Sequence, residues 1–205
     1  MEQFATEEQQ VEAIKRFWKE NGIAIMVGAV IGLGALWGWQ YYSDSQLAAK
    51  EAASQGYQEV VENLQADDGI VRAEAFLANH QSSGYAAMTA LVLAAQEVEN
   101  NNLEAALGHL QTAVQSKDGS LQNVAKMRLA RVQLAMNEAQ AALDSVAKID
   151  AEAFTAQVEE IKGDAYVMLA DFTNARLAYS AAVEADSANR IVKMKLDNLA
   201  ITAGS

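Results

Sequence analysis

The side chains that could perform acid–base, nucleophilic or metal chemistry are few in this chain, and their spacing does not bring them together. Its two histidines, His80 and His109, each lack a second ligand three or four residues further on, the spacing that puts two metal ligands on one helix face. The chain has no cysteine, so disulfides, thiolate catalysis and zinc–thiolate sites are excluded. The pair Glu159 and Glu160 is typical of a solvated helix face. We therefore expect a protein that is not an enzyme and that holds no metal or cofactor.

The charge balance of the chain is strongly acidic. The 205 residues include 27 Asp and Glu against 15 Lys and Arg, and residues 43–205 hold 22 against 12. Nucleic-acid binding needs Lys and Arg at the phosphates, so this composition argues against nucleic acid as a partner. Proline is also absent, so no ring breaks a helix, and turns must rest on Gly, Asn, Asp and Ser.

Residues 21–42, NGIAIMVGAVIGLGALWGWQYY, form an uncharged apolar run between charged flanks. A helix from Gly22 to Tyr42 is about 31 Å long, which matches the hydrocarbon core of a bilayer. A signal-peptide apolar region is shorter, about 7–15 residues, and ends in small residues. This run instead ends in Trp37, Trp39, Tyr41 and Tyr42, which are typical of a membrane–water interface. A buried helix of a soluble protein rarely extends so far without a charge, so the run predicts an uncleaved transmembrane helix.

The flanks of this run predict its orientation. Lys15, Arg16 and Lys19 precede it, whereas the residues that follow it directly are polar or acidic. An excess of Lys and Arg marks the cytoplasmic side, so we expect a cytoplasmic N-terminus and residues 43–205 on the other side. Residues 1–20 form either an amphipathic helix on the inner membrane surface or a solvated lead-in, and the sequence leaves both open.

The predicted span carries two pairs of glycines at a spacing of four residues. Gly28 pairs with Gly32, and Gly34 pairs with Gly38. Small residues at this spacing let two membrane helices approach closely. We predict that these four positions form a membrane-helix interface; glycine tolerated in lipid without a partner is the alternative.

From Tyr85 onward the chain repeats, with intervals of 36 and then 33 residues between equivalent positions. In three helical hairpins, Ala94, Ala130 and Gly163 correspond, as do Ala106, Ala142 and Ala175, and then Leu110, Val146 and Tyr179. Small residues where two helices cross and a large residue beside them, at a period near 34, are typical of the tetratricopeptide repeat. The first-helix Trp of that motif is missing, and Ser187 stands at its terminal Pro position.

A last helix, SANRIVKMKLDNLAI, follows the repeats, and we expect Ser187 to cap its N-terminus. We expect Ile191, Met194 and Leu199 to cover the open end of the array, because a solenoid needs terminal caps. The predicted fold is all-α: one N-terminal transmembrane helix followed by a tetratricopeptide-repeat-like α-solenoid with a C-terminal capping helix.

The chain then divides into four segments. These are a cytoplasmic segment (1–20), the transmembrane helix (21–42), a membrane-proximal helical pair (43–84), and three repeats with the capping helix (85–205).

In such an array the first helices of successive repeats line a concave groove. The register predicts that this groove is lined by Met88, Leu91, Ala95 and Val98 of the first repeat, Val124, Met127, Arg131 and Leu134 of the second, and Glu160, Asp164, Val167 and Met168 of the third. The groove would be apolar at one end and acidic at the other, with flexible Met side chains suited to varied partners. Burial of these residues under the C-terminal helix is the equally open alternative.

Four stretches of the chain, in this order and spacing, carry a resemblance to a known family. They are VEAIKRFWKENG with VGAVIGLGALWGW, then LEAALGHLQ, LARVQLAMNEAQAALDSV and MKLDNLAI. They resemble the YfgM family, the ancillary subunits of the SecYEG translocon in bacterial inner membranes, from about Val11 to Ile201. The resemblance implies a single-pass inner-membrane protein with a periplasmic repeat domain. Its implied partners are SecYEG, the periplasmic chaperone PpiD and emerging client chains.

Two functions remain open on this basis. The first is an interaction scaffold on the translocon that links secretion to the periplasmic chaperone network. The second is a scaffold for envelope assembly or maintenance unrelated to secretion, since repeat folds serve many partners. Copurification of partners in mild detergent separates the two.

Overall fold

The computed structural model describes residues 7–81, 83–149 and 152–202, and this part of the chain is helical with no β-strand. Its elements are α1 (Glu7–Asn63), α2 (Gly69–Asn79), α3 (Gly84–Glu99), α4 (Leu103–Ala113), α5 (Gly119–Ala135), α6 (Ala139–Val146), a 3₁₀ turn (Glu152–Phe154), α7 (Thr155–Met168), α8 (Phe172–Ala185) and α9 (Arg190–Thr202). The chain divides into two compact units, and the second begins at Ala53. The all-α prediction is confirmed.

Helix α1 is a single helix of 57 residues. It passes without a break through the segment boundaries that we predicted after residues 20 and 42, because the sequence there offers no proline to stop it. Those two boundaries therefore follow polarity and not secondary structure. They stay predictions about where a membrane begins and ends.

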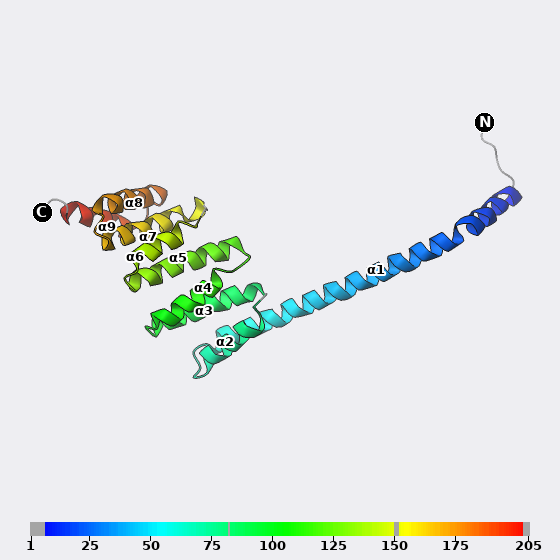
Figure 1. The fold of residues 1–205 in the computed structure, drawn as a ribbon, viewed down its shortest axis with the longest axis horizontal. Coiled ribbons are helices and arrows are strands. Elements are labelled where there is room, and N and C mark those ends of the chain that lie inside the picture. Colours follow the sequence, from blue (N-terminus) through cyan, green and yellow to red (C-terminus); the bar gives the residue numbers. More distant parts are fainter. Residues whose placement is uncertain (1–6, 82, 150–151, 203–205) are drawn as a thin grey trace, which may run out of the picture. The chain divides into compact units, whose positions relative to one another are not determined.

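The second unit is a stack of antiparallel helical hairpins, in which α3 packs on α4, α5 on α6 and α7 on α8 (Figure 1). Each hairpin also contacts the next one along the chain, through α4 with α5 and through α6 with α7. This nearest-neighbour packing is the arrangement of a repeat solenoid.

Helix α2 and the last turns of α1 form a hairpin that joins this stack at its N-terminal end. Val60, Ala73 and Phe76 are buried there together with Leu93 of α3, so the hairpin and the first repeat share one apolar cluster. The two helices approach closely because Gly56 has no side chain: a Cβ at that position would lie 2.6 Å from Cε2 of Phe76. The end of α1 from Ala53 onward and helix α2 are therefore packed as part of the array.

The predicted repeat register is confirmed by burial. The small residues at the helix crossings (Ala94, Ala130, Gly163, Ala106, Ala142, Ala175) and the large residues beside them (Leu110, Val146, Tyr179) are all buried. The third hairpin is closely packed, because a Cβ on Gly163 would overlap the ring of Tyr179. The sequence therefore places glycine where the backbone of α7 meets an aromatic ring of α8.

The turns between the two helices of each repeat share one backbone conformation. Asn101, Asn137 and Ala170 each have a positive φ, of 62°, 64° and 58°. Asparagine adopts this left-handed conformation readily, but an alanine there is strained. The third repeat therefore carries a strained turn that the first two avoid.

Helix α9 covers the end of the array, but not with the face that we predicted. Val192 and Leu199 are buried against Tyr179 and Ala182 of α8, whereas Ile191 and Met194 are 60% and 57% exposed. The prediction for Ile191 and Met194 was therefore wrong, and that for Leu199 was right. The face at 192, 196 and 199 has the spacing of successive helical turns, and it is the face that packs.

The start of α9 also differs from the prediction. The helix begins at Arg190, and the side-chain oxygen of Asn189 accepts hydrogen bonds from the backbone N–H groups of Ile191 and Val192, at 3.1 and 3.2 Å. Ser187 lies too far upstream to reach these groups, so Asn189 is the capping residue.

Candidate functional site

The apolar run in α1 has almost no protein around it. In the 18-residue window that meets the length and composition of a membrane span, mean hydropathy is 1.8 and only 6% of residues are buried. Ile23 and Trp37 are each 81% exposed. A helix at the core of a soluble protein would be mostly buried, so that alternative does not fit, whereas the exposed apolar surface fits a helix in a bilayer.

The four glycines of this run lie in open space in the structure. A Cβ built on Gly28, Gly32, Gly34 or Gly38 would meet no described atom within 4 Å. Nothing within the described chain therefore requires glycine at these positions. The helix interface that we predicted there stays a prediction.

The residues predicted to line the groove fall into two groups. Leu91 and Met127 are only 7% and 8% exposed, because each packs into an apolar cluster with the following helices. The others remain half-buried or exposed: Met88, Ala95, Val98, Val124, Arg131, Leu134, Glu160, Asp164, Val167 and Met168. The surface formed by the first helices α3, α5 and α7, hereafter the first-helix surface, is thus open at most of the predicted positions.

The acidic end of this surface is partly neutralised from within the chain, because one lysine binds two carboxylates. Lys195 of α9 places its Nζ 2.9 Å from Oε1 of Glu160 and 2.8 Å from both carboxylate oxygens of Asp164, all on α7. The hydroxyl of Tyr179 donates a further hydrogen bond of 2.6 Å to Asp164. The end that we predicted to be acidic is therefore a closed polar cluster that fixes α9 to the third repeat.

This cluster shifts the protonation of its two proton donors. Burial raises the pKa of Tyr179, and the hydrogen bond to Asp164 and the nearby carboxylates raise it further. Burial alone would lower the pKa of Lys195, but its hydrogen bonds to Asp164 and Glu160 outweigh this effect and raise it. Both groups therefore hold their protons more firmly in the folded protein than in the unfolded chain.

The middle of the first-helix surface is basic, which the sequence reasoning recognised only in part. After Ser120, the exposed residues of α5 are Arg128, Arg131 and Ala135. They are spaced by three and four residues, so they lie on one helix stripe. The prediction named Arg131 but not Arg128, although the same spacing in the sequence was a signal that could have found it.

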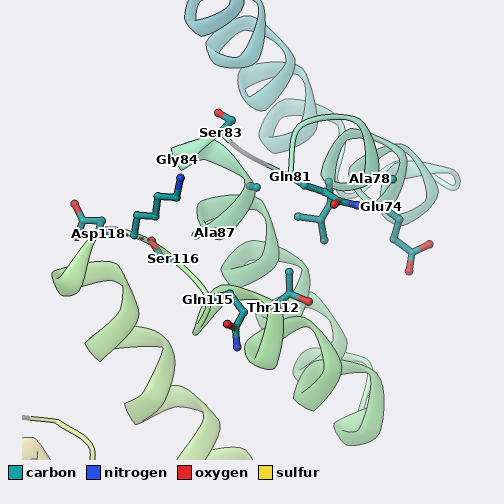
Figure 2. A pocket seen from close by; sticks show the side chains of 13 residues that line it. Glu74, Ala78, Gln81, Ser83, Gly84, Ala87, Thr112, Gln115, Ser116 and Asp118 are labelled. Atoms are coloured by element: carbon teal, nitrogen blue, oxygen red, sulfur yellow. Dashed lines mark hydrogen bonds between the residues drawn. The ribbon is translucent and has the colours of Figure 1, made fainter.

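A cavity of about 620 Å³ opens on another part of the second unit, between α2, the start of α3 and the α4–α5 connection (Figure 2). Its polar side chains include Glu74, Gln115 and Asp118. The carboxylate of Asp118 accepts a hydrogen bond from the backbone of Leu121 and so caps α5. Its described lining holds no nucleophile in contact with a base, and its size alone assigns it no chemistry.

The two histidines also have structural surroundings. The ring of His80 stacks on that of Phe76 with centroids 4.5 Å apart, and Nε2 of His109 lies 3.9 Å from a carboxylate oxygen of Glu74. Among the residues that the structure describes, no three His, Cys, Asp or Glu side chains are grouped as metal ligands would be.

Comparison with known proteins matches residues 15–201 to the tetratricopeptide repeat-like domain. The chain is 38% identical over 207 residues to a protein of Escherichia coli K12 named ancillary SecYEG translocon subunit, covering 98% of this chain and 100% of that protein. Proteins of the same name from Haemophilus influenzae and Neisseria gonorrhoeae are each 30% identical, and both comparisons cover 94% of this chain and 97% of the relative.

Proposed function

Because this chain belongs to the family of YfgM-like ancillary SecYEG translocon subunits with a tetratricopeptide repeat-like domain, we propose that it is itself an ancillary subunit of the translocon. In this proposal α1 anchors the chain in the inner membrane, and the repeats form a periplasmic scaffold for protein–protein interactions. The scaffold links secretion to the periplasmic chaperone network, with a PpiD-like chaperone as partner and secreted chains as possible clients.

One observation carries the proposal: the similarity to the Escherichia coli relative includes nearly the whole of both chains. This similarity therefore includes both the apolar run and the repeats, in the same order along the two chains. It is not confined to a repeat domain. Repeat folds serve many partners, so a match confined to the repeats would have supported only the fold. The exposed apolar face of α1 and the open first-helix surface fit a membrane-anchored scaffold without catalytic activity.

Copurification tests the proposed association. The full chain, carrying an affinity tag and expressed at its natural level, is solubilised in mild detergent and isolated. We expect SecY, SecE and SecG to be recovered with it, and a PpiD-like chaperone as well. Recovery of envelope-assembly proteins without any SecYEG subunit would support the alternative scaffold function and refute this one.

The proposed orientation places the N-terminus in the cytoplasm and the repeats in the periplasm. It rests on Lys15, Arg16 and Lys19 before the apolar run. Protease added to intact spheroplasts should digest the repeat domain. Protection of the domain in sealed spheroplasts, followed by its digestion after lysis, would show the opposite orientation.

The glycines of α1 provide the proposed contact within the membrane. Leucine at Gly28, Gly32, Gly34 and Gly38 would add side chains where none now lies, and it should keep a partner helix from close approach. We expect weaker recovery of membrane partners and unchanged unfolding of the repeat domain. Unchanged recovery with all four leucines would place the interface elsewhere.

A further inference from the structure

The exposed stripe of α5 carries two guanidinium groups without a carboxylate partner in the described chain. Arg128 and Arg131 are both exposed, and no described Asp or Glu oxygen lies within 4 Å of either of them. They are three residues apart, so they lie side by side on one helix face. In a chain of net charge −12 this is a local basic site whose charge no described carboxylate pairs with.

Helix α3, which contacts α5, presents an apolar row on the same surface. Met88 and Val92 are half-buried, and Ala95 and Val98 are exposed, with Val98 at 43%. These residues recur at the spacing of successive helical turns. The first-helix surface therefore offers an apolar row and a basic row on neighbouring helices.

Lys195 reduces the negative charge that α7 presents to a ligand of the first-helix surface. Glu160 and Asp164 would repel an acidic ligand if they were unpaired, but Lys195 binds both carboxylates and offsets one of their two negative charges. The remaining charge on the described first-helix surface near its centre is that of the two arginines. Guanidinium groups bind carboxylates through paired hydrogen bonds, so the charge complement of this surface is acidic.

We propose that the first-helix surface binds a protein segment that is both apolar and acidic, with its apolar side chains against α3 and its carboxylates at Arg128 and Arg131. This inference rests on the proposed scaffold function and specifies the chemistry of the partner. The segment is an amphipathic stretch of a partner or client protein with Asp or Glu beside a row of apolar residues. A basic segment of equal apolarity is rejected because it faces the arginines.

The test uses the full-length protein in mild detergent and a double variant, Arg128→Gln with Arg131→Gln. A matched control, Arg176→Gln with Arg190→Gln, removes the same charge from exposed positions of α8 and α9 that also have no described carboxylate partner. Because all four arginines are exposed, we expect both variants to unfold at the temperature of the original protein. Arg128→Lys with Arg131→Lys keeps the charge and reports whether charge is what matters.

The probes are three fluorescent peptides of about four helical turns, with leucines on one face. One carries Glu on the neighbouring face, the second carries Gln there and the third carries Lys. Fluorescence anisotropy should show that the Glu peptide binds more tightly than the other two and that salt weakens its binding. On the Gln double variant its Kd should rise about tenfold, which corresponds to about 1.4 kcal/mol. The Lys variant should bind it more tightly than the Gln double variant but less tightly than the original protein, because lysine keeps the charge without the paired hydrogen bonds. The control should bind it as the original protein does.

Equal binding of the Glu and Lys peptides would overturn the inference, and so would an unchanged Kd on the Gln double variant. SecYEG copurification with the same double variant separates this inference from the proposed function. Loss of peptide binding with SecYEG retained confirms the surface and leaves the translocon association intact. If the original protein recovers no SecYEG, the proposed function fails, whatever the peptides do.

Discussion

The close contact between α7 and α8 makes one substitution especially informative. In the third repeat, a Cβ on Gly163 would overlap the ring of Tyr179, which is 3% exposed. The ring has little freedom to move, because its hydroxyl is bonded to Asp164. Replacing Gly163 with alanine therefore forces α7 and α8 apart or distorts the ring, and overpacking of this kind costs about 1–3 kcal/mol.

Alanine also brings a gain, because it favours a helix interior over glycine by about 0.8–1.0 kcal/mol. Gly108 of α4 measures this gain alone, since a Cβ there would meet nothing within 4 Å. We expect Gly108→Ala to stabilise the domain by up to about 1 kcal/mol and Gly163→Ala to destabilise it by up to about 2 kcal/mol. The difference between the two variants isolates the helix contact.

The assay is thermal and urea unfolding of the full chain in mild detergent, followed by circular dichroism. For a domain of this size, about 1 kcal/mol corresponds to a shift in Tm of about 2–4 °C. In a Tyr179→Leu background, which removes the ring, Gly163→Ala should no longer destabilise. A Gly163→Ala protein as stable as Gly108→Ala would refute the packing of α7 on α8, and with it the repeat register.

Three further results follow from single contacts. Ala170→Gly should stabilise the domain by about 0.5–1 kcal/mol in urea unfolding, because glycine tolerates the positive φ at this turn; a loss of stability would contradict that geometry. The hydroxyl of Thr89 is buried without a partner in the described structure, so Thr89→Val should raise stability by about 1 kcal/mol, and a clear loss would reveal an unseen partner. Because the pKa values of Lys195 and Tyr179 are raised in the folded protein, both groups stabilise the fold at pH values below their ordinary pKa values of 10.5 and 10.0. This stabilisation is lost as the pH rises through the raised pKa values. Tm should therefore fall in strong alkali, and by less in Tyr179→Phe; an equal fall in both would exclude the tyrosine's contribution.

The hairpin register was predictable from sequence because its determinants are local. Two helices can cross closely only over a small residue, so the small side chains at Ala130 and Gly163 already mark the crossings in the sequence. The absence of proline is compatible with the continuity of α1, but we did not predict one helix from Glu7 to Asn63. Such features depend on the residue itself and on its near neighbours in the sequence.

The packing face of α9 depended on a distant contact. Its sequence holds two overlapping apolar stripes, one through Ile191 and Met194 and one through Val192 and Leu199. Both have helical spacing, so periodicity did not decide between them. In the structure the second stripe is buried, and Lys195 reaches the carboxylates of α7, 31 and 35 residues away in sequence. For Leu91 and Met127 the sequence left groove lining and burial equally open, and neighbouring helices bury both residues in the structure.

Photocrosslinking in living cells tests the translocon association most directly. A photoreactive amino acid is placed in α1 at Ile31, which is 66% exposed, and on the first-helix surface at Val98. After irradiation, the account predicts adducts with a SecYEG subunit from Ile31 and with a periplasmic chaperone or secreted chain from Val98. The account would be contradicted by adducts with other membrane proteins and none with any SecYEG subunit. This result would have to hold for both positions and for their neighbours along the same helix.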